Sequence, residues 1–173
     1  MRKIIIAAAI VCGIYIYGCT GVSTNADAQT QKNIDAVNAV DNAIRTGDVS
    51  KLGDYMAEDC VDSSGGEAVI KGIDAFKKML GAIHSQSKDM KMDVVKTLAD
   101  NEYVFQWVHL YGTSDDASMG MPAGTKYDFT PIEVSKFTNG KVSQHWEFMT
   151  VAEMMKMMAN MPSSTATDTT KTK

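Results

Sequence analysis

The sequence predicts an α+β fold in which helices come first and a curved antiparallel sheet follows. Up to about residue 84 the apolar residues recur every three to four positions, as in amphipathic helices. From residue 90 they alternate with polar residues, as in strands, and Asp100-Asn101 and Asn139-Gly140 supply turn signals between them. With 173 residues, 45% of them hydrophobic, the chain suits a single globular domain.

Three helices are expected before residue 90. The first has an apolar stripe and ends at Gly47, and a short second helix follows Asp48, a residue that favours helix starts. A short extended piece at 60–63 leads to the turn Gly65-Gly66, and the third helix follows Gly72. The residues expected to face inward are Ile34, Val37, Val40 and Ile44, then Val49, Leu52, Tyr55 and Met56, then Ile73, Phe76, Met79, Leu80 and Ile83.

Four strands and a last helix are expected after residue 90. The strands cover 90–98, 103–111, 126–138 and 141–150, and the helix covers 151–161. In 103–111 the odd positions are aromatic or histidine and the even positions are mostly aliphatic, so neither face is plainly polar. We therefore expect helices to cover one face and a second copy of the chain to cover the other, in a homodimer.

The first residues resemble an export signal. Arg2 and Lys3 precede an apolar run, 4–17, which is shorter than the about 20 residues that span a bilayer. Cys19 directly after it is expected to be lipidated, which would anchor an exported protein to a membrane; cleavage after Ala28 would instead release it in soluble form. The expected boundaries are 1–28 for the signal and linker, 29–161 for the domain and 162–173 for a solvated tail.

Composition and motifs exclude several function classes. A net charge of −4 gives no basic excess for nucleic acid. The sequence has no nucleotide-binding glycine motif, no C-x-x-C pair and no histidine spacing typical of zinc, so no cofactor and no metal are expected. Outside the first 19 residues the only cysteine is Cys60, which leaves no intramolecular disulfide.

Several motifs resemble one family by their order and spacing. They are Gly47-Asp48, Ala57-Glu58-Asp59 before a strand, Gly72 opening a helix, the segment 121–126, and 139–142 continuing to His145-Trp146-Glu147. Together they are similar to SnoaL-like domains of the nuclear-transport-factor-2-like superfamily, over about residues 30–150. The resemblance implies a cone of curved sheet wrapped around helices, with a pocket at its wide end. Members include polyketide cyclases, ketosteroid isomerases and dehydratases, so the fold alone does not decide the function.

Two acids are candidate catalytic groups by this resemblance. Asp62 lies near the position of the isomerases' general base, and a carboxylate in an apolar cone could take an acidic C–H proton. Thr130-Pro131-Ile132-Glu133 resembles the segment in which a protonated acid holds a developing oxyanion, a role expected here of Glu133. The alternatives are a solvated loop aspartate for Asp62 and an exposed or lysine-paired Glu133.

Aromatic residues and one histidine complete the candidate site. His109 could polarise a carbonyl or relay a proton, or could simply pack in the core. Trp107, Tyr111 and Trp146 are candidates to line an apolar ligand pocket, with core packing as the alternative.

Two positions depart from the chemistry of the family. Val40 stands where the isomerases carry an oxyanion-hole tyrosine, and Thr150 stands where the cyclases carry a catalytic aspartate. We therefore expect the domain to bind a small hydrophobic organic molecule, with an enzyme that abstracts a proton next to a carbonyl through Asp62, Glu133 and His109 as the alternative.

A third function is suggested by methionines. Thirteen are present, and Val151, Met154, Met155 and Met158 form one stripe of the last expected helix. Such a stripe is typical of core or interface packing. A surface that docks a protein or Cu(I) is the remaining alternative.

Overall fold

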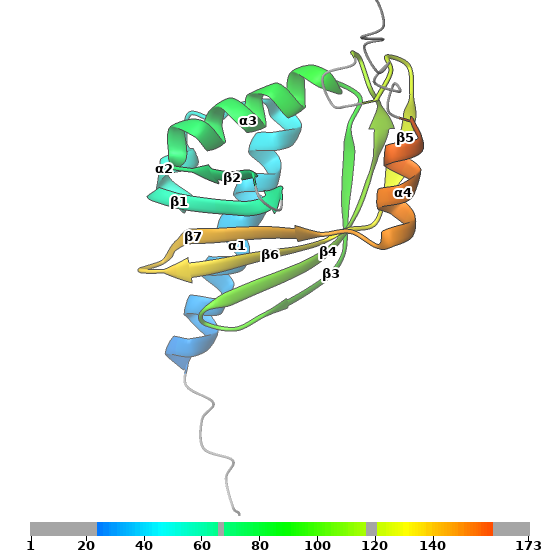
Figure 1. Cartoon of the computed structure of the whole chain (residues 1–173). Helices are drawn as coiled ribbons and strands as arrows, with labels where there is room; N and C mark the ends of the chain where they lie inside the picture. The colour runs from blue at the N-terminus through cyan, green and yellow to red at the C-terminus, as the bar shows by residue number, and fades with distance from the viewer. Residues whose placement is uncertain (1–23, 66–67, 117–120, 161–173) are drawn as a thin grey trace, which may run out of the picture.

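The computed structural model describes residues 24–65, 68–116 and 121–160 (Figure 1). The elements follow the order α1 (Thr24–Thr46), α2 (Leu52–Tyr55), β1 (Met56–Gly65), β2 (Ala68–Lys71), α3 (Ile73–Gln86), β3 (Lys91–Ala99), β4 (Tyr103–Thr113), β5 (Lys126–Phe129), β6 (Ile132–Thr138), β7 (Lys141–Phe148) and α4 (Val151–Asn160). The predicted α+β class is confirmed, although β1 and β2 precede α3 and β2 was not predicted. The expected leader and tail lie almost entirely outside the described residues, although α1 already begins at Thr24.

The strands form one curved sheet in the order β2-β1-β7-β6-β4-β3, with β5 paired to β4 beyond β6. All pairs are antiparallel except β1 with β7, which run parallel. Figure 1 shows α1 and α3 against one face of the curved sheet and α4 beside β5. This is the predicted cone of sheet wrapped around helices, open at one side.

One expected strand is two strands in the structure. The segment 126–138 is interrupted at Thr130-Pro131, and its halves pair with different parts of β4: Phe129 lies opposite Leu110, and Ile132 lies opposite Trp107. Proline has no N–H for the ladder, so the break falls where a strand can lose a hydrogen bond. The extended piece expected at 60–63 is longer in the structure, where β1 runs from Met56 to Gly65.

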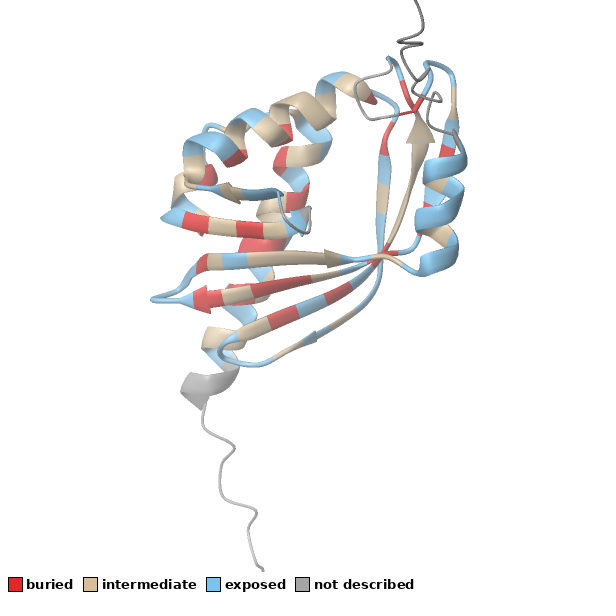
Figure 2. Ribbon diagram, viewed as in Figure 1, coloured by how far each residue is buried: buried red, intermediate tan, exposed pale blue. Residues whose placement is uncertain are grey.

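The main core lies between the helices and the concave face of the sheet. It contains the expected apolar positions of α1 and α3 together with inward residues of β1, β4, β6 and β7 (Figure 2). Asn139 and Gly140, both at positive φ, form the predicted tight turn between β6 and β7. Cys60 is buried in this core and free.

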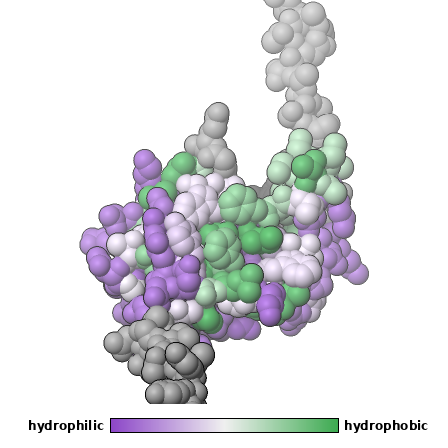
Figure 3. Space-filling view, turned by 90° about the horizontal axis from the view of Figure 1, so that it is seen from below, coloured by the Kyte–Doolittle hydropathy of each residue, from purple (hydrophilic) through white to green (hydrophobic). Residues whose placement is uncertain are grey.

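The other face of the sheet leaves large apolar side chains exposed. The even positions of β4 from 104 to 108 are buried, whereas Phe105 is 42% and Trp107 48% exposed. Their neighbours Leu98, Ile132 and Phe148 are exposed too. We call these five residues the outer apolar face. Seen from below, hydrophobic side chains gather in the middle of the surface (Figure 3). The sequence correctly predicted that helices cover only one face.

Helix α4 differs from the expectation of core packing. Its stripe of Val151, Met154, Met155 and Met158 is exposed, and the half-buried Met157 instead packs on a second cluster of Met121, Tyr127 and Phe129. The reason is that α4 contacts the sheet through the flank that carries Glu153 and Met157, so the methionine stripe faces outward.

Candidate functional site

Strand register brings the polar residues of three strands together on the concave face. Asp62 of β1 lies opposite His145 of β7, which lies opposite Ser135 of β6. In the next row, Glu133 of β6 lies between Gln106 of β4 and Glu147 of β7. Because residues opposite one another in a sheet share a face, both rows point toward the helices.

Four of these side chains line a small cavity beneath α1 and α3: Asp62, Glu133, Ser135 and His145. Its volume is about 40 Å³, enough for one or two water-sized groups and far below that of drug-sized ligand sites, about 300 Å³ or more. The helices contribute mainly apolar side chains and β6 and β7 mainly polar ones. The lining residues are Val37, Val40, Asp41, Met56, Asp62, Phe76, Met79, Leu80, Glu133, Ser135, Val142 and His145.

The buried Asp62 and the half-buried His145 form a pair in this cavity. His145 Nδ1 lies 3.4 Å from Asp62 Oδ2, and the backbone N–H of Ser64 donates to Asp62 Oδ1 at 2.6 Å. Burial opposes the charge of Asp62, but the hydrogen bonds from His145 and Ser64 outweigh it and lower the pKa of Asp62. Burial likewise opposes the charge of His145, and the hydrogen bond to Asp62 with the charge of Glu133 nevertheless raises its pKa. Both shifts favour the ionised pair.

Asp41 enters the cavity from α1. It is only 6% exposed, and its Oδ2 has no hydrogen-bond partner among the described residues. Burial and, next, the charge of Glu133 raise the pKa of Asp41 to about 8, against weaker opposite effects of His145 and Arg45. Asp41 therefore holds a proton at neutral pH.

Glu133 is the second acid whose ionisation is disfavoured. Burial raises its pKa to about 7, and the charges of Glu147 and Asp62 act in the same direction, while His145 acts against them. Burial also raises the pKa of Glu147. The cavity thus combines the ionised Asp62–His145 pair, which can accept a hydrogen bond or a proton, with two acids, Asp41 and Glu133, which can donate a hydrogen bond or a proton.

Two of the three predicted catalytic residues meet in this cavity, and the third does not. Asp62 and Glu133 both line it. His109 lies on the opposite face of the sheet, where its Nε2 is 3.0 Å from Asp128 Oδ1. The reason is strand parity: Val108 and Gln106 of β4 are fully buried, so His109 points outward. The histidine of the cavity is His145.

The three predicted ligand-lining aromatics also lie away from the cavity. Trp107 belongs to the outer apolar face, and the Tyr111 hydroxyl donates to Asp93 Oδ2 at 3.1 Å. Trp146 lies opposite Val134, which lies opposite Phe105, so Trp146 is on the outer face as well. The cavity is instead lined by the aliphatic, methionine and phenylalanine side chains of α1, α3 and β1.

Sequence reasoning missed Asp41 and His145. A signal was available for each: Asp41 lies seven residues after Ile34 and so occupies the apolar stripe of α1, and His145 belongs to the His-Trp-Glu segment of β7. Val40, at the position of the isomerases' tyrosine, does line the cavity. Thr150 does not, because it caps α4. Cys19 lies outside the described residues.

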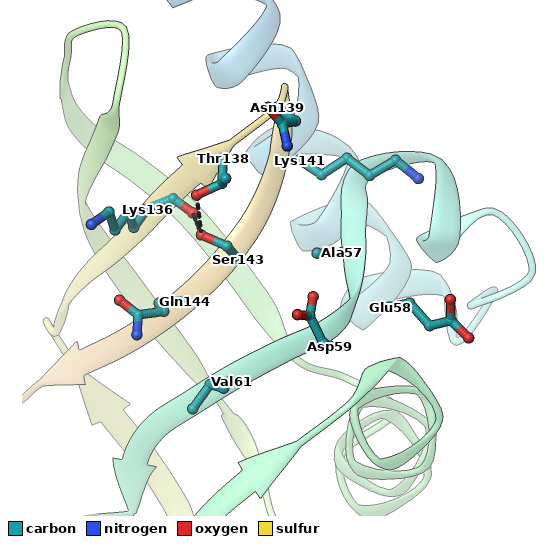
Figure 4. A pocket seen from close by; sticks show the side chains of 10 residues that line it. All are labelled: Ala57, Glu58, Asp59, Val61, Lys136, Thr138, Asn139, Lys141, Ser143 and Gln144. Carbon is teal, nitrogen blue, oxygen red and sulfur yellow. Dashed lines mark hydrogen bonds between the residues drawn. The ribbon is translucent and has the colours of Figure 1, made fainter.

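A larger hollow lies on the other face of β6 and β7 (Figure 4). It is an open groove of about 700 Å³ between β1 and the β6–β7 hairpin. It exists because Ala57–Cys60 of β1 bulge away from β7, where the register passes from Met56–Val142 to Val61–Gln144. Some of its polar side chains bond one another or another element: Thr138 Oγ1 lies 3.0 Å from Ser143 Oγ, and Lys141 Nζ donates to the Gly53 carbonyl. The acids with strongly raised pKa values, Asp41 and Glu133, line the smaller cavity instead.

The described part of the chain contains no group of three or more His, Cys, Asp or Glu side chains arranged to hold a metal ion. Within that same part, no helix is both long and apolar enough to cross a membrane.

The comparison with family models identifies one family. A family model described as SnoaL-like polyketide cyclase matches residues 34–158. A search of curated proteins finds no match to the sequence.

Solved structures of low sequence identity share the fold. A protein from Jannaschia sp. CCS1 assigned to the SnoaL-like polyketide cyclases is 14% identical, with a TM-score of 0.67 over 77% of this chain and 95% of that one. An LEH-like epoxide hydrolase from M. tuberculosis is 18% identical, with a TM-score of 0.61 over 76% and 92%. A SnoaL-like polyketide cyclase from Agrobacterium tumefaciens is 14% identical, with a TM-score of 0.61 over 73% and 97%.

Proposed function

The chain belongs to the SnoaL-like polyketide cyclase family, and we propose that its inner cavity binds the polar end of a small, otherwise apolar organic molecule. The observation that carries this proposal is the ionised Asp62–His145 pair beside the partly neutral Glu133, enclosed by apolar side chains of α1 and α3. Such a site recognises one polar group by hydrogen bonds and the rest of the ligand by burial of apolar surface.

The volume of the cavity limits how the ligand sits. About 40 Å³ accepts a carbonyl, hydroxyl or amino group with one or two carbons, so the remainder of a longer molecule must displace side chains. Met56 and Met79 line the cavity and are unbranched, so they can change rotamer more readily than β-branched residues. We expect binding to move these two methionines.

Binding is tested with a matched panel of aliphatic ketones, alcohols and amines, measured by the midpoint of thermal unfolding. Ligands with a polar end and a chain of four to eight carbons should stabilise the protein, and the alkane of equal length should not. Glu133→Gln should weaken the stabilisation at least threefold, whereas Glu102→Gln, outside the cavity, should leave it unchanged. A panel without any stabilising member would refute the proposal.

A second candidate function is proton transfer next to a carbonyl. The specific support is that the pKa of Asp62 is lowered while that of Glu133 is raised, which separates a proton acceptor from a proton donor in one cavity. The test is deuterium exchange at the α-carbon of a bound ketone in D₂O, followed by proton NMR. Exchange that disappears in Asp62→Asn supports turnover; stabilisation by the ketone without exchange leaves binding alone.

We also propose that a second copy of the chain covers the outer apolar face. Phe105, Trp107 and Ile132 are each more than two-fifths exposed. Such a group of large apolar side chains on the surface of a monomer is typical of an interaction site.

For the segment outside the described residues we propose export, with a lipid on Cys19. Replacement of Cys19 by alanine should then move the protein from the membrane fraction to the soluble fraction.

A further inference from the structure

The inner cavity contains far more acid than base. Asp41, Asp62 and Glu133 line it together with a single basic side chain, His145. Glu147 lies next to Glu133 in the sheet and acts electrostatically on it, on His145 and on Asp62. Arg45, one turn along α1 from Asp41, is exposed and offers only a distant positive charge. After His145 has paired with Asp62, the other acids of the cluster have no basic partner there.

Asp41 shows that not every hydrogen-bonding position of these acids is filled within the described part of the protein. Its Oδ2 is buried, lines the cavity and meets no donor among the described residues. A buried oxygen without a partner costs about 1–3 kcal/mol, and a buried charge costs more. An aspartate that served the core alone would be replaced at a gain in stability, because the same helix face carries Val37 and Val40. The orphaned oxygen can accept a hydrogen bond from a ligand, and a ligand that also carries positive charge favours the ionised form of Asp41.

The chemistry of the lining decides between kinds of cation. A bare metal ion needs several oxygen or nitrogen ligands at short distance, and no such group of three occurs among the described residues. An ammonium group has three N–H donors on a compact head and tolerates an apolar surrounding behind it. The lining of the cavity contains both kinds of group, with acids from α1, β1 and β6 and apolar side chains such as Phe76 and Leu80.

We propose that the inner cavity binds the protonated amino group of a small alkylamine, with Asp41 and Glu133 as its hydrogen-bond acceptors and the Asp62–His145 pair beside them. The inference rests on the proposed function, since it specifies the polar end that the same cavity takes. The volume of about 40 Å³ fits the ammonium head and its first carbons. The rest of the alkyl chain lies where Met79 now sits.

Binding of an ammonium group also moves protons in a defined direction. The ligand favours the carboxylate form of Asp41 and Glu133, whose pKa values in the empty cavity are about 8 and about 7. Between pH 6 and 8 the binding of the amine should therefore release protons, and its affinity should increase with pH. A neutral alcohol has no preference for the ionised acids and should release none.

The experiment compares n-butylamine hydrochloride with 1-butanol on the whole chain, with sodium chloride added to equalise ionic strength. The amine should raise the midpoint of thermal unfolding by about 2–6 °C at concentrations ten to twenty times its Kd, and should bind at least tenfold more tightly than the alcohol. Calorimetry at pH 6.5 in two buffers of different ionisation enthalpy should show proton release for the amine only.

Two variants locate the effect. Asp41→Asn keeps the shape of the side chain and should abolish the advantage of the amine over the alcohol, as should Glu133→Gln if the first variant folds poorly. Asp35→Asn makes the same substitution at an exposed position of the same helix. This variant should keep the advantage of the amine over the alcohol.

The possible results separate the two proposals. Stabilisation by butanol with no advantage for the amine, or an advantage that survives in Asp41→Asn, overturns the ammonium site and leaves the binding cavity standing. No stabilisation by either compound overturns the ammonium site, and the binding cavity is overturned as well only if the whole panel of ketones, alcohols and amines also fails to stabilise the protein.

Discussion

The Glu153 carboxylate joins helix α4 to the sheet through Thr130. Its Oε1 accepts hydrogen bonds from the backbone N–H of Thr130 at 2.6 Å and from the Thr130 hydroxyl at 2.8 Å. Its Oε2 accepts two more from Thr150, whose hydroxyl in turn accepts one from the Glu153 N–H, in a reciprocal N-terminal cap. These bonds, of which that from the Thr150 hydroxyl contributes most, lower the pKa of Glu153 to about 2.

Loss of this carboxylate should release α4 from the sheet. We expect Glu153→Ala to cost about 1–2 kcal/mol of unfolding free energy, by loss of the cap. Amide exchange in 151–160 should accelerate well before global unfolding, because few other contacts tie α4 to the sheet. Glu102→Ala, an exposed acid paired with Lys136, is the matched control and should leave these amides protected. Unchanged exchange in the Glu153 variant would contradict this role.

The Glu153 carboxylate also predicts that helix α4 loosens at low pH. Its pKa is lowered in the folded protein, so its stabilising contribution is complete above about pH 4.5 and is lost as the pH falls toward about 2. Far-ultraviolet circular dichroism and exchange at pH 2–3 should show α4 loosening first. Glu153→Gln should show the looser helix already at pH 6, with little further change in acid.

Asp41 predicts an opposite dependence at higher pH. Its pKa is raised to about 8, so its contribution favours the folded state most below the ordinary aspartate pKa and declines as the pH rises to about 8. We expect Asp41→Asn to stabilise the protein by about 1–3 kcal/mol at pH 8 and by much less at pH 4. Urea unfolding at several pH values measures this difference. A variant equally destabilised at both pH values would show that Asp41 is held by partners of its own.

Gly47 ends α1 in a conformation that other residues adopt poorly. Its φ is 72°, and an added Cβ would lie 2.5 Å from Cδ2 of His84. Gly47→Ala should therefore destabilise the protein by about 1–3 kcal/mol. Gly81 lies inside helix α3, and a Cβ there would meet no atom within 4 Å. Gly81→Ala should stabilise the protein by about 0.5–1 kcal/mol, and chemical denaturation of both variants checks the opposite signs.

The outer apolar face predicts self-association. Trp107→Glu, in the middle of the face, should convert a dimer to a monomer in sedimentation velocity without lowering the unfolding midpoint of the monomer. Val69→Glu, at an exposed position of β2, should leave the mass unchanged. A wild-type protein that sediments as a monomer at 100 μM would remove this proposal.

The sequence predicted the helices and strands of this fold better than it predicted how the strands pair and which side chains meet. Periodicity located α1, α3 and the strands from β3 onward, with β5 and β6 as one, and Asn139-Gly140 located the hairpin, because these depend on local spacing and on residues that tolerate positive φ. The strand β2 was not predicted. The break at Pro131 was missed because it depends on which part of β4 each half pairs with. That is a long-range property of the sheet.

The site was only half predictable for a similar reason. Asp62 and Glu133 were chosen by family position and do share the cavity. His109 was chosen because it shares a face of its strand with aromatic residues such as Trp107, but parity on β4 turns that face outward. Asp41 and His145 come from different ends of the chain and meet only through the packing of α1 on β6 and β7. No pattern within either segment describes such a meeting.

The placement of Trp107 and Trp146 has a practical consequence. The chain has only these two tryptophans, and both indoles belong to the side of the sheet turned away from the helices. Intrinsic fluorescence is therefore an optical reporter of whatever comes to rest on that side, read by emission wavelength and by quenching with acrylamide. Occupancy beneath α1 and α3 needs another probe, such as ¹³C-methyl signals of the methionines there.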